Sequence, residues 1–478
     1  MRTECSQLRF GFLGRREVVG GFDGGRISSD GGLMLIAEID RQYGVTARIA
    51  ESLSDQREEK KIQQPLVDMV RQRVYQIVAG YEDCNDAAQM AGDAVLKLAV
   101  NRCPESDRDL ASQPTLSRFE NAVSRTDLYR ASAALVELFI ADTRAPQRII
   151  LDIDPTVDPT HGNQQLSLFN GFYDTHCYLP VLIFGSADGG PHRPVASVLR
   201  PGNASAGASA RSILQRIVAQ LRQAWPHTQI LIRGDSGYAL PELYDWCEAQ
   251  PAVDYLFGFP TNSRLKQLVE PHLVTARLQH LLHGAKVRLL RETRYAAHTW
   301  PHERRVIMKA EVSDQGDNPR FVVTSLEHGT TDEIYQLYAD RGDAENRIKE
   351  LKDDLHADRT SCTRFIANQF RLLLHTIAYA LICRLRAHLA GTVLATAQAG
   401  TLRSKLIKVG VRVRQTVRKV WLHFASAYPL KHLWDTILNR LRPPRCPHPT
   451  RPAENSPSPD NPRPTSRLPA CAYQPLRR

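Results

Sequence analysis

The chain has 478 residues, 42% of them hydrophobic, so it can form two to four domains with a substantial core. Its 62 Lys and Arg residues against 51 Asp and Glu residues give a formal charge of +11, which favours a polyanionic partner such as nucleic acid. The sequence contains no Gly-rich phosphate loop, no HExxH motif and no Gly-x-Ser-x-Gly elbow. These absences argue against ATP-driven enzymes, metalloproteases of that type and serine hydrolases.

The cysteines and the hydropathy pattern indicate where the protein functions. Nine scattered cysteines, without a Cys-x-x-Cys pair or a nearby His at zinc-finger spacing, indicate a reducing compartment and no structural zinc. The N-terminus, MRTECSQLRF, lacks the apolar core of a signal peptide. The longest apolar stretch, near residues 372–383, contains His375 and is too short to span a bilayer. We therefore expect a cytoplasmic protein with no membrane partner.

Residues 1–145 are predicted to form an all-α N-terminal region. The segment SSDGG can cap the apolar run LMLIAEI, and PLVDMVRQRVYQIVAGY repeats its apolar residues at helical spacing. Our hypothesis is that this region contributes to DNA recognition.

Residues 146–260 change to a mixed α/β pattern. Short runs rich in branched and aromatic residues predict buried strands: RIILDID, YLPVLIFG, PVASVLR, QILIRGD and DYLFGFP. Between and after them, ARSILQRIVAQLRQAW and LPELYDWCEA have the spacing of amphipathic helices. Residues 261–330 are predicted to be a β-rich insertion, from the runs KVRLLRETRYAAHTW, RRVIMKAEVS and RFVVTSL.

The remainder of the chain is predicted to be helical and then disordered. Residues 331–395 have helical spacing, and residues 396–442 form a basic region in which KVWLHFASAY is also compatible with a helix. Ten Lys and Arg residues lie within 403–442 against one acid, Asp435, which favours a binding surface. Residues 443–478 contain eleven prolines and few large apolar residues, a composition typical of a disordered tail.

Two of the predicted strands end in aspartate. RIILDIDPT places Asp154 at a strand end and Asp152 two residues earlier on the same face, and QILIRGDSGY ends in Asp235. A carboxylate just beyond an apolar strand is held by the core while its oxygens reach solvent, and Mg²⁺ prefers such ligands. An Asp after a strand is also a common turn former or helix cap, so neither aspartate decides the question alone.

A third acidic residue lies in YQLYADRGDAENRIKELKDDL, where Tyr338, Arg341, Glu345 and Lys352 are spaced Tyr-x2-Arg-x3-Glu-x6-Lys. On one α-helix these side chains would project within a sector of about 60°. The simplest alternative is an exposed helix with an ordinary ion pair between Arg341 and Glu345. Together, the strand aspartates and Glu345 could hold two cations about 3.5–4 Å apart, an arrangement that suits in-line attack on a phosphodiester.

With these motifs, the sequence resembles the DDE transposases of bacterial insertion sequences, in the branch marked by a Tyr-Arg-Glu-Lys signature. It is most similar to the insertion sequence thirteen-eighty group. The likeness runs from SSDGGLMLIAEID through LDIDPTVDPTHGNQ, IRGDSGY and the signature helix to TLRSKLIKVGVRVR, over roughly residues 20–435. The proline-rich tail after Arg442 departs from the family pattern.

The resemblance implies an α/β fold with a ribonuclease-H-like catalytic core, interrupted by a β-strand insertion domain. It implies that Asp154, Asp235 and Glu345 are the catalytic ligands of two Mg²⁺ ions, with Mn²⁺ as an accepted substitute. Asp154 is preferred to Asp152 and Asp158 because Asp154-Pro155-Thr156 matches the family's Asp-x-Thr.

The resemblance also implies contacts with DNA. Tyr338, Arg341 and Lys352 would grip phosphates near the scissile bond, and Trp300 is a candidate for holding a flipped base, with core packing as its alternative role. His161 and His176 receive no role. The expected partners are the terminal inverted repeats and the target DNA, bound by a homodimer in a bacterial cytoplasm near the nucleoid.

Three functions remain open from the sequence. The first is cut-and-paste transposition through a hairpin intermediate, the second a ribonuclease-H-fold nuclease without strand transfer, and the third a catalytically silent DNA-binding relative. The three carboxylates favour the first, the long insertion and the signature helix count against the second, and the basic C-terminal region alone could support the third.

Overall fold

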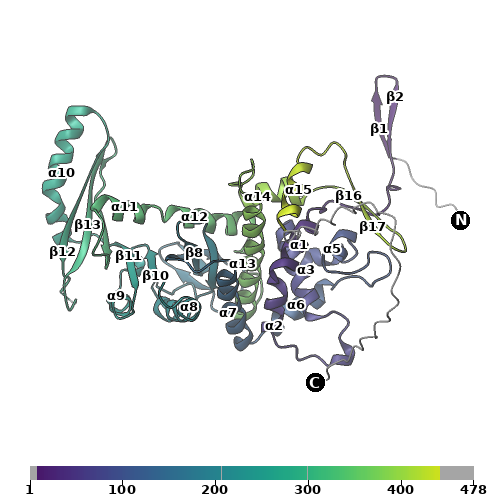
Figure 1. Ribbon diagram of the computed structural model, residues 1–478, viewed down its shortest axis with the longest axis horizontal. Coiled ribbons are helices and arrows are strands. Elements are labelled where there is room, and N and C mark those ends of the chain that lie inside the picture. The colour runs from purple at the N-terminus through teal and green to yellow at the C-terminus, as the bar shows by residue number, and fades with distance from the viewer. Residues whose placement is uncertain (1–7, 206, 299, 442–478) are drawn as a thin grey trace, which may run out of the picture. The chain divides into compact units, whose positions relative to one another are not determined.

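The computed structural model describes residues 8–205, 207–298 and 300–441 (Figure 1). The proline-rich tail predicted at 443–478 lies outside the described residues. The central element is a nine-stranded mixed sheet in the order β12-β13-β15-β11-β10-β4-β8-β9, with β14 paired to β13. Its strands are β4 (Arg148–Pro155), β8 (Val181–Ala187), β9 (Arg193–Val198), β10 (Gln229–Gly234), β11 (Val253–Phe259), β12 (Val287–Tyr295), β13 (Arg304–Ser313), β14 (Gly316–Asp317) and β15 (Arg320–Thr324).

Three strands at the centre of the sheet are parallel: β10 pairs with β4 on one side and with β11 on the other. The remaining pairs of this sheet are antiparallel. Between β4 and β8 the chain forms a small separate sheet of β5 (Asp158–Pro159), β6 (Leu168–Asn170) and β7 (Thr175–Tyr178). The parallel centre matters for the site because parallel strands bring their carboxyl ends to the same edge.

Alternation along β4 divides its side chains between two cores. Ile149, Leu151 and Ile153 pack in a cluster with helices on one face, while Ile150 packs in a second cluster with the other face. The first face is covered by α7 (Arg125–Ala141), α8 (Ala210–Ala224), α9 (Pro241–Glu248) and α10 (Ser263–His283), and the second by α11 (Thr331–Ala339). Figure 1 shows α8 and α9 on the side of the sheet opposite α11 and α12 (Gly342–Lys349). Asp152 and Asp154 therefore belong to the α11 face, as alternation predicted.

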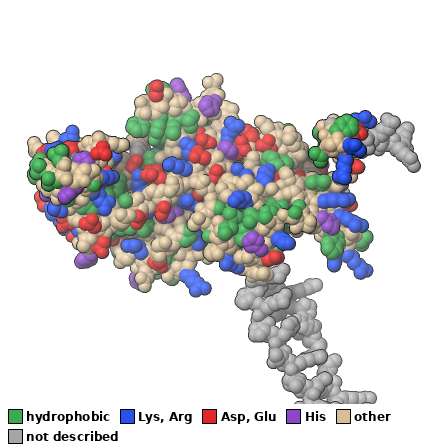
Figure 2. Space-filling view, turned by 90° about the horizontal axis from the view of Figure 1, so that it is seen from above, with side chains coloured by type: hydrophobic (Ala, Val, Ile, Leu, Met, Phe, Trp, Pro, Cys, Tyr) green, Lys and Arg blue, Asp and Glu red, His purple; other side chains and the backbone are tan. Residues whose placement is uncertain are grey.

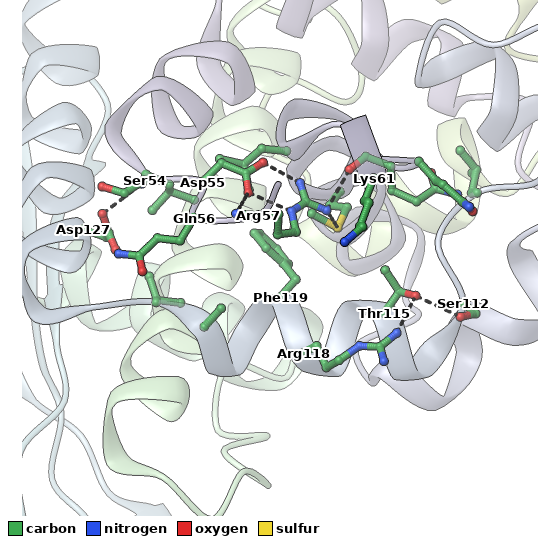
Figure 3. A pocket seen from close by; sticks show the side chains of 18 residues that line it. Ser54, Asp55, Gln56, Arg57, Lys61, Ser112, Thr115, Arg118, Phe119 and Asp127 are labelled. Atoms are coloured by element: carbon green, nitrogen blue, oxygen red, sulfur yellow. Dashed lines mark hydrogen bonds and ion pairs between the residues drawn. The ribbon is translucent and has the colours of Figure 1, made fainter. Parts of the chain in front are cut away.

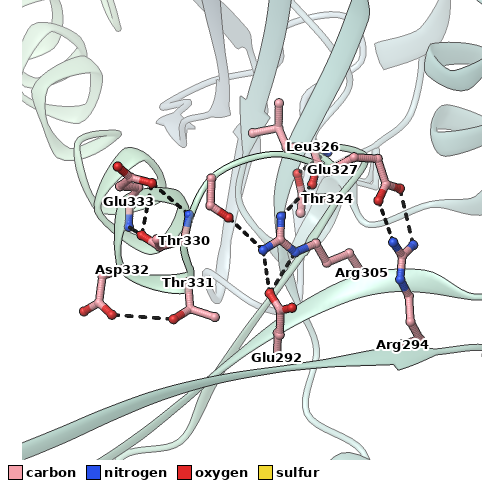
Figure 4. Close-up of polar contacts among 11 residues, drawn as sticks. Glu292, Arg294, Arg305, Thr324, Leu326, Glu327, Thr330, Thr331, Asp332 and Glu333 are labelled. Atoms are coloured by element: carbon pink, nitrogen blue, oxygen red, sulfur yellow. Dashed lines mark hydrogen bonds and ion pairs between the residues drawn. The ribbon is translucent and has the colours of Figure 1, made fainter.

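Polar contacts fix the start of α11 to the sheet (Figure 4). Arg305 on β13 donates to the carboxylate of Glu292 on β12 and to the carbonyl oxygens of Leu326 and Gly329 just before the helix. At the helix start, the Thr330 hydroxyl and the Glu333 carboxylate each accept from the other residue's backbone N–H, a reciprocal cap. The direction of α11, and so the placement of its last turn, is set by the sheet.

The N-terminal region is mainly helical, as predicted, but it is not entirely so. A two-stranded hairpin, β1 (Leu8–Leu13) with β2 (Arg16–Gly20), precedes it, and β3 (Ile27–Ser28) pairs with a C-terminal strand. Its helices are α1 (Leu33–Tyr43), α2 (Val45–Ser52), α3 (Leu66–Ala79), α4 (Ala87–Met90), α5 (Ala94–Ala99), α6 (Gln113–Ala122) and α7, with short 3₁₀ turns at Glu59–Lys61 and Cys84–Asp86.

The prediction of a purely β-rich segment at 261–330 is wrong at its start. Residues Ser263–His283 form α10, a 21-residue helix that packs on β13 and β12. The strands that follow do not form a separate sheet, because β13 and β15 extend the central one through β11. Pro271 inside the helix and the exposed side chains of Leu278, Leu281 and Leu282 obscured the helical pattern.

The helical prediction for residues 331–442 also needs correction. After α12 the chain makes a π-helical turn at Glu350–Asp354, then an irregular segment, and then α13 (Phe365–Ala387), α14 (Ala399–Leu402) and a second π-helical turn at Arg403–Ile407. The basic region then forms a hairpin of β16 (Val411–Gln415) and β17 (Val420–Phe424) before α15 (Lys431–Leu441). The stretch predicted as helix from KVWLHF is therefore a strand, whose alternating side chains were mistaken for helical spacing.

The helix α13 is longer than the apolar stretch in the sequence suggested. By length and composition it could cross a membrane, but 83% of its most apolar window is buried inside the fold. It packs between the N-terminal helix α3 and strand β9. Its apolar character is that of a core helix.

Candidate active site

Asp154 and Asp235 lie at the ends of neighbouring parallel strands. The last registered pair of β4 and β10 is Ile153 with Gly234, so the two aspartates are the next residue on each strand. The Oδ1 atom of Asp235 accepts a hydrogen bond of 2.8 Å from the backbone N–H of Gly237, which fixes the carboxylate at the start of a short 3₁₀ turn, Ser236–Tyr238. The sheet thus places both carboxylates at one edge.

Arg341 connects this edge to the helix that contains Glu345. Its Nη1 atom lies 3.0 Å from Oδ1 of Asp154, and its Nη2 atom lies 2.5 Å from Oε1 of Glu345. The ordinary i, i+4 ion pair considered from the sequence is therefore present, but the same guanidinium also binds a strand aspartate. We call Asp154, Asp235 and Glu345 the acidic cluster.

The electrostatics of Asp154 show that the three carboxylates act on one another. Burial raises the pKa of Asp154 to about 7; Arg341 opposes this rise, and the negative charges of Asp235 and Glu345 add to it. The pKa of Arg341 is raised, because attraction to Asp154 and Glu345 outweighs the effect of its own burial. Arg341 is thus the cation that balances the acidic cluster.

Tyr338 packs against the same edge from α11. A Cβ atom built on Gly258 would lie 2.6 Å from the Tyr338 hydroxyl and 3.0 Å from the backbone nitrogen of Ser236. Burial raises the pKa of Tyr338, with Arg341 opposing this rise and Asp235 adding to it. Glycine at position 258 therefore provides the space in which Tyr338 reaches the segment that follows Asp235.

Lys352 lies apart from the acidic cluster. Its Nζ atom donates a hydrogen bond of 2.8 Å to the carbonyl oxygen of Val157. The four signature residues do not share one continuous α-helix, because α11 ends at Ala339, α12 begins at Gly342 and Lys352 belongs to the π-helical turn. Tyr338, Arg341 and Glu345 are brought to the strand aspartates, whereas Lys352 reaches the chain just after β4.

The two alternative aspartates have structural partners. Asp152 is 2% exposed and accepts from Arg233 at 2.7 and 2.8 Å, with His192 at 2.9 Å from its Oδ2 atom. Asp158 is also buried, and its Oδ2 atom accepts a hydrogen bond of 2.8 Å from the Thr360 hydroxyl. Both carboxylates hold pieces of the fold together, so Asp154 remains the candidate ligand.

The other residues singled out in the sequence are placed away from this cluster. The ring of Trp300 packs with Tyr244, Phe259 and Tyr295 at ring-centroid distances of 5.3–5.6 Å, and the guanidinium of Arg304 lies over it. These contacts are those of the core-packing role. The ring of His176 on β7 packs against Phe169. His161 lines a small polar pocket between the segments 159–164 and 358–363.

One aromatic residue near the cluster was not found from the sequence. Tyr173 lies in the turn between β6 and β7, and its pKa is raised by burial and by the charges of Asp154 and Asp235. Its neighbour Phe172 is 88% exposed. Nothing in the spacing of Asn170–Asp174 marks these residues, since only the fold brings this turn to the end of β4.

The chemistry of the acidic cluster suits a divalent cation, because three carboxylates supply the oxygen ligands that Mg²⁺ prefers. In the described part of the chain, no three His, Cys, Asp or Glu side chains stand close enough together to hold a metal as they lie. The guanidinium of Arg341 occupies the position between Asp154 and Glu345. A cation that binds both carboxylates would therefore have to displace this guanidinium.

A larger cavity lies among the N-terminal helices (Figure 3). It has a volume of about 640 Å³ and is lined by residues of α3, α6, α7 and the connecting segments, among them Arg57, Lys61 and Phe119. Arg57 is held by Asp55 and by the carbonyl oxygen of Gln64. No residue of the acidic cluster lines this cavity, and it offers no comparable set of carboxylates.

Comparison with known families identifies the class of protein. A family model described as transposase DDE domain group 1 matches residues 10–446. The chain belongs to this family. A comparison with curated proteins gave no match. As a DDE transposase, the protein is a nucleotidyl-transferase-type enzyme whose family acts on DNA and generally uses a divalent metal. Its mixed α/β architecture agrees with the fold of DDE nucleases.

Proposed function

We propose that this transposase is an active cut-and-paste enzyme of the Tyr-Arg-Glu-Lys branch, similar to the insertion sequence thirteen-eighty group. It would bind the terminal inverted repeats of its element as a homodimer, cleave them through a hairpin intermediate and join them to target DNA. The observation that supports this most is that the guanidinium of Arg341 pairs with both Asp154 and Glu345, while the charge of Asp235 acts on Asp154. We assign the central sheet and its helices to a ribonuclease-H-like catalytic core.

In this proposal Asp154, Asp235 and Glu345 hold two Mg²⁺ ions, and Mn²⁺ substitutes for them. When bound, such ions activate an attacking oxygen and neutralise negative charge at a phosphodiester during in-line displacement. The protein's part is to hold three carboxylates at the end of a rigid sheet. Because burial raises the pKa of Asp154 to about 7, the fraction in the ionised form that binds a cation would depend on pH near neutrality.

Arg341 has a second part in the proposal. Its guanidinium now donates to Asp154 and forms an ion pair with Glu345, and a phosphate group could accept from both of the same nitrogens. When DNA arrives, Arg341 would exchange the carboxylates for phosphate oxygens and leave their oxygens free. The enzyme would thereby complete its metal site only with its substrate in place.

Tyr338 and Lys352 would hold the DNA on either side of the scissile phosphate. The Tyr338 hydroxyl lies beside Gly258 and the segment after Asp235, where it can donate to a phosphate. The Lys352 ammonium, which uses one donor on the carbonyl oxygen of Val157, has two further donors for a phosphate on the other side. The scissile phosphate would lie between them, against the acidic cluster.

The test uses DNA that flanks the coding region, because a terminal inverted repeat is expected there. Purified protein is incubated with a labelled fragment containing each flank, a supercoiled target plasmid and Mg²⁺, with an EDTA control. The proposal predicts cleavage at one discrete site in each flank and joined products, both dependent on Mg²⁺. Cleavage without joined products would instead support a nuclease, and binding without cleavage a silent DNA-binding relative. Either of these results would refute the proposal.

A further inference from the structure

The hairpin of β16 and β17 has one apolar and one basic face. Val411 and Val413 are buried in the core of the helical region. The alternate residues Arg412 and Arg414 are exposed, and they lie opposite His423 and Trp421 on β17. The exposed face of the hairpin therefore presents two Arg side chains paired across the strands with two rings. We call Arg412, Arg414, Trp421 and His423, with Arg418 and Lys419 at the turn, the basic hairpin face.

The charge of this face is not neutralised within the protein. Residues 411–424 contain four Lys and Arg residues and no Asp or Glu. Within the described residues, none of these four cations forms an ion pair with an acidic side chain. The nearby Glu105, whose backbone N–H donates to the Gln415 side chain, faces Arg26 instead. Lys and Arg side chains gather on the surface where β16 and β17 lie (Figure 2).

The aromatic side chain on this face is also available. Trp421 is 49% exposed, its ring stacks on His423 at 6.4 Å, and the Lys419 ammonium lies 5.4 Å from its centroid. The combination of cations with flat rings is typical of nucleic-acid contacts.

The hairpin is attached firmly enough to act as a recognition element. β16 pairs with β3, and the N–H of Val413 donates to the carbonyl oxygen of Arg26 at 2.8 Å. Phe424 on β17 packs against Trp434 of α15 at 4.7 Å. A two-stranded ribbon alone is marginally stable, so this third strand and the helix fix the direction of the basic face.

We propose that the basic hairpin face is a docking site for duplex DNA, separate from the acidic cluster. This inference rests on the proposed function, which makes DNA the substrate. The major groove of B-DNA is wide enough to admit a two-stranded β-ribbon, and the ribbon's side chains then reach both phosphate backbones. Arg412 and Arg414 would contact phosphates, while Trp421 and His423 lie against the groove wall.

The test compares the Arg412→Ala/Arg414→Ala double variant with a matched control, Arg211→Ala/Lys266→Ala. The control removes two exposed cations from α8 and α10 that, like the hairpin arginines, have no ion pair among the described residues. Binding to the flanking duplex is measured between 50 and 300 mM salt. Loss of two phosphate contacts should weaken binding at least about tenfold and reduce the slope of log K against log salt by about 2.

The remaining outcomes separate this inference from the proposed function. The charge-retaining Arg412→Lys/Arg414→Lys variant should keep the wild-type salt slope. Equal affinity and slope for the Ala variant, the control and the wild type would overturn the docking site while leaving the transposase proposal intact. A preference of the wild type for single-stranded over duplex DNA would also overturn it. Failure of the wild type to bind DNA at any salt would overturn both.

Discussion

Arg341 donates a hydrogen bond of 3.0 Å to the carboxylate of Asp154, although the two residues are 187 positions apart in the sequence. The bond joins the helix after the sheet to the end of a central strand, and the same guanidinium holds Glu345. A cation placed between two carboxylates both stabilises them and keeps them from any other cation.

Arg341→Ala should make cleavage more dependent on pH. Arg341 lowers the pKa of Asp154 from the value that burial and the neighbouring carboxylates would otherwise produce, so its loss should raise that pKa above about 7. Because the ionised carboxylate is the metal ligand, cleavage should fall at pH 7 and partly recover towards pH 9. The control is Arg347→Ala, which removes an i, i+3 partner of Glu350 on the same helix. Coinciding pH profiles for all three proteins would contradict this role.

Asp152→Asn should destabilise the fold, whereas Asp154→Asn should not. The first change leaves the Arg233 guanidinium, 1% exposed, without its ionic partner, at a cost of about 3–5 kcal/mol. The second removes a half-buried carboxylate that Asp235 and Glu345 repel, and it leaves Arg341 paired with Glu345, so its unfolding midpoint at pH 8 should equal or exceed that of the wild type. Urea denaturation at pH 8 measures both. Equal destabilisation by the two changes would show that Asp154 is a structural residue like Asp152.

Gly258→Ala should impair catalysis through Tyr338. The added methyl group would lie 2.6 Å from the Tyr338 hydroxyl, so the ring must move. A displacement of about 1 Å at an active site can reduce turnover by about a hundredfold, and we expect a loss of at least about tenfold. Adding Tyr338→Phe removes the clashing oxygen and should restore part of the lost thermal stability. If Gly258→Ala cleaves like the wild type, Tyr338 does not need its observed position.

Asp158→Asn should stabilise the protein at alkaline pH. Burial raises the pKa of Asp158 to about 8, well above that of an unfolded chain. The folded state therefore retains a proton that the unfolded state loses, so wild-type stability falls as the pH rises from about 4 to about 8. The Asn side chain can still accept from Thr360 but does not titrate. Its advantage in melting temperature should be greater at pH 9 than at pH 5, and a pH-independent difference would contradict the assignment.

Local patterns in the sequence predicted the positions of the two aspartates of the acidic cluster. Alternation in RIILDID placed Asp152 and Asp154 on one strand face, and the parallel register aligned Asp154 with Asp235. The pattern could not distinguish Asp152 from Asp154, because the difference lies in Arg233, which is contributed by the neighbouring strand. The reach of Arg341 to Asp154 likewise depends on how α11 crosses the sheet.

The incorrect predictions have physical causes in the chain itself. Pro271 and the exposed leucines of α10 weakened its helical pattern, and tertiary packing on β13 holds the helix nonetheless. In VWLHF the spacing of the apolar residues fits both the helical and the strand repeat. The segment forms a strand because it pairs with β16. Lys352 was placed by a uniform helical wheel, which does not allow for the π-helical turn at Glu350–Asp354.

The central claim is that Glu345 completes a metal-binding set with Asp154 and Asp235. Its most direct test measures DNA binding and Mg²⁺-dependent cleavage together for the wild type, Glu345→Ala and the control Asp343→Ala. Asp343 is an exposed acid two residues away on the same helix, with no side-chain partner among the described residues. The account predicts that Glu345→Ala binds the flanking duplex like the wild type and does not cleave it, while Asp343→Ala does both. Cleavage by Glu345→Ala at the wild-type rate would contradict the three-carboxylate site.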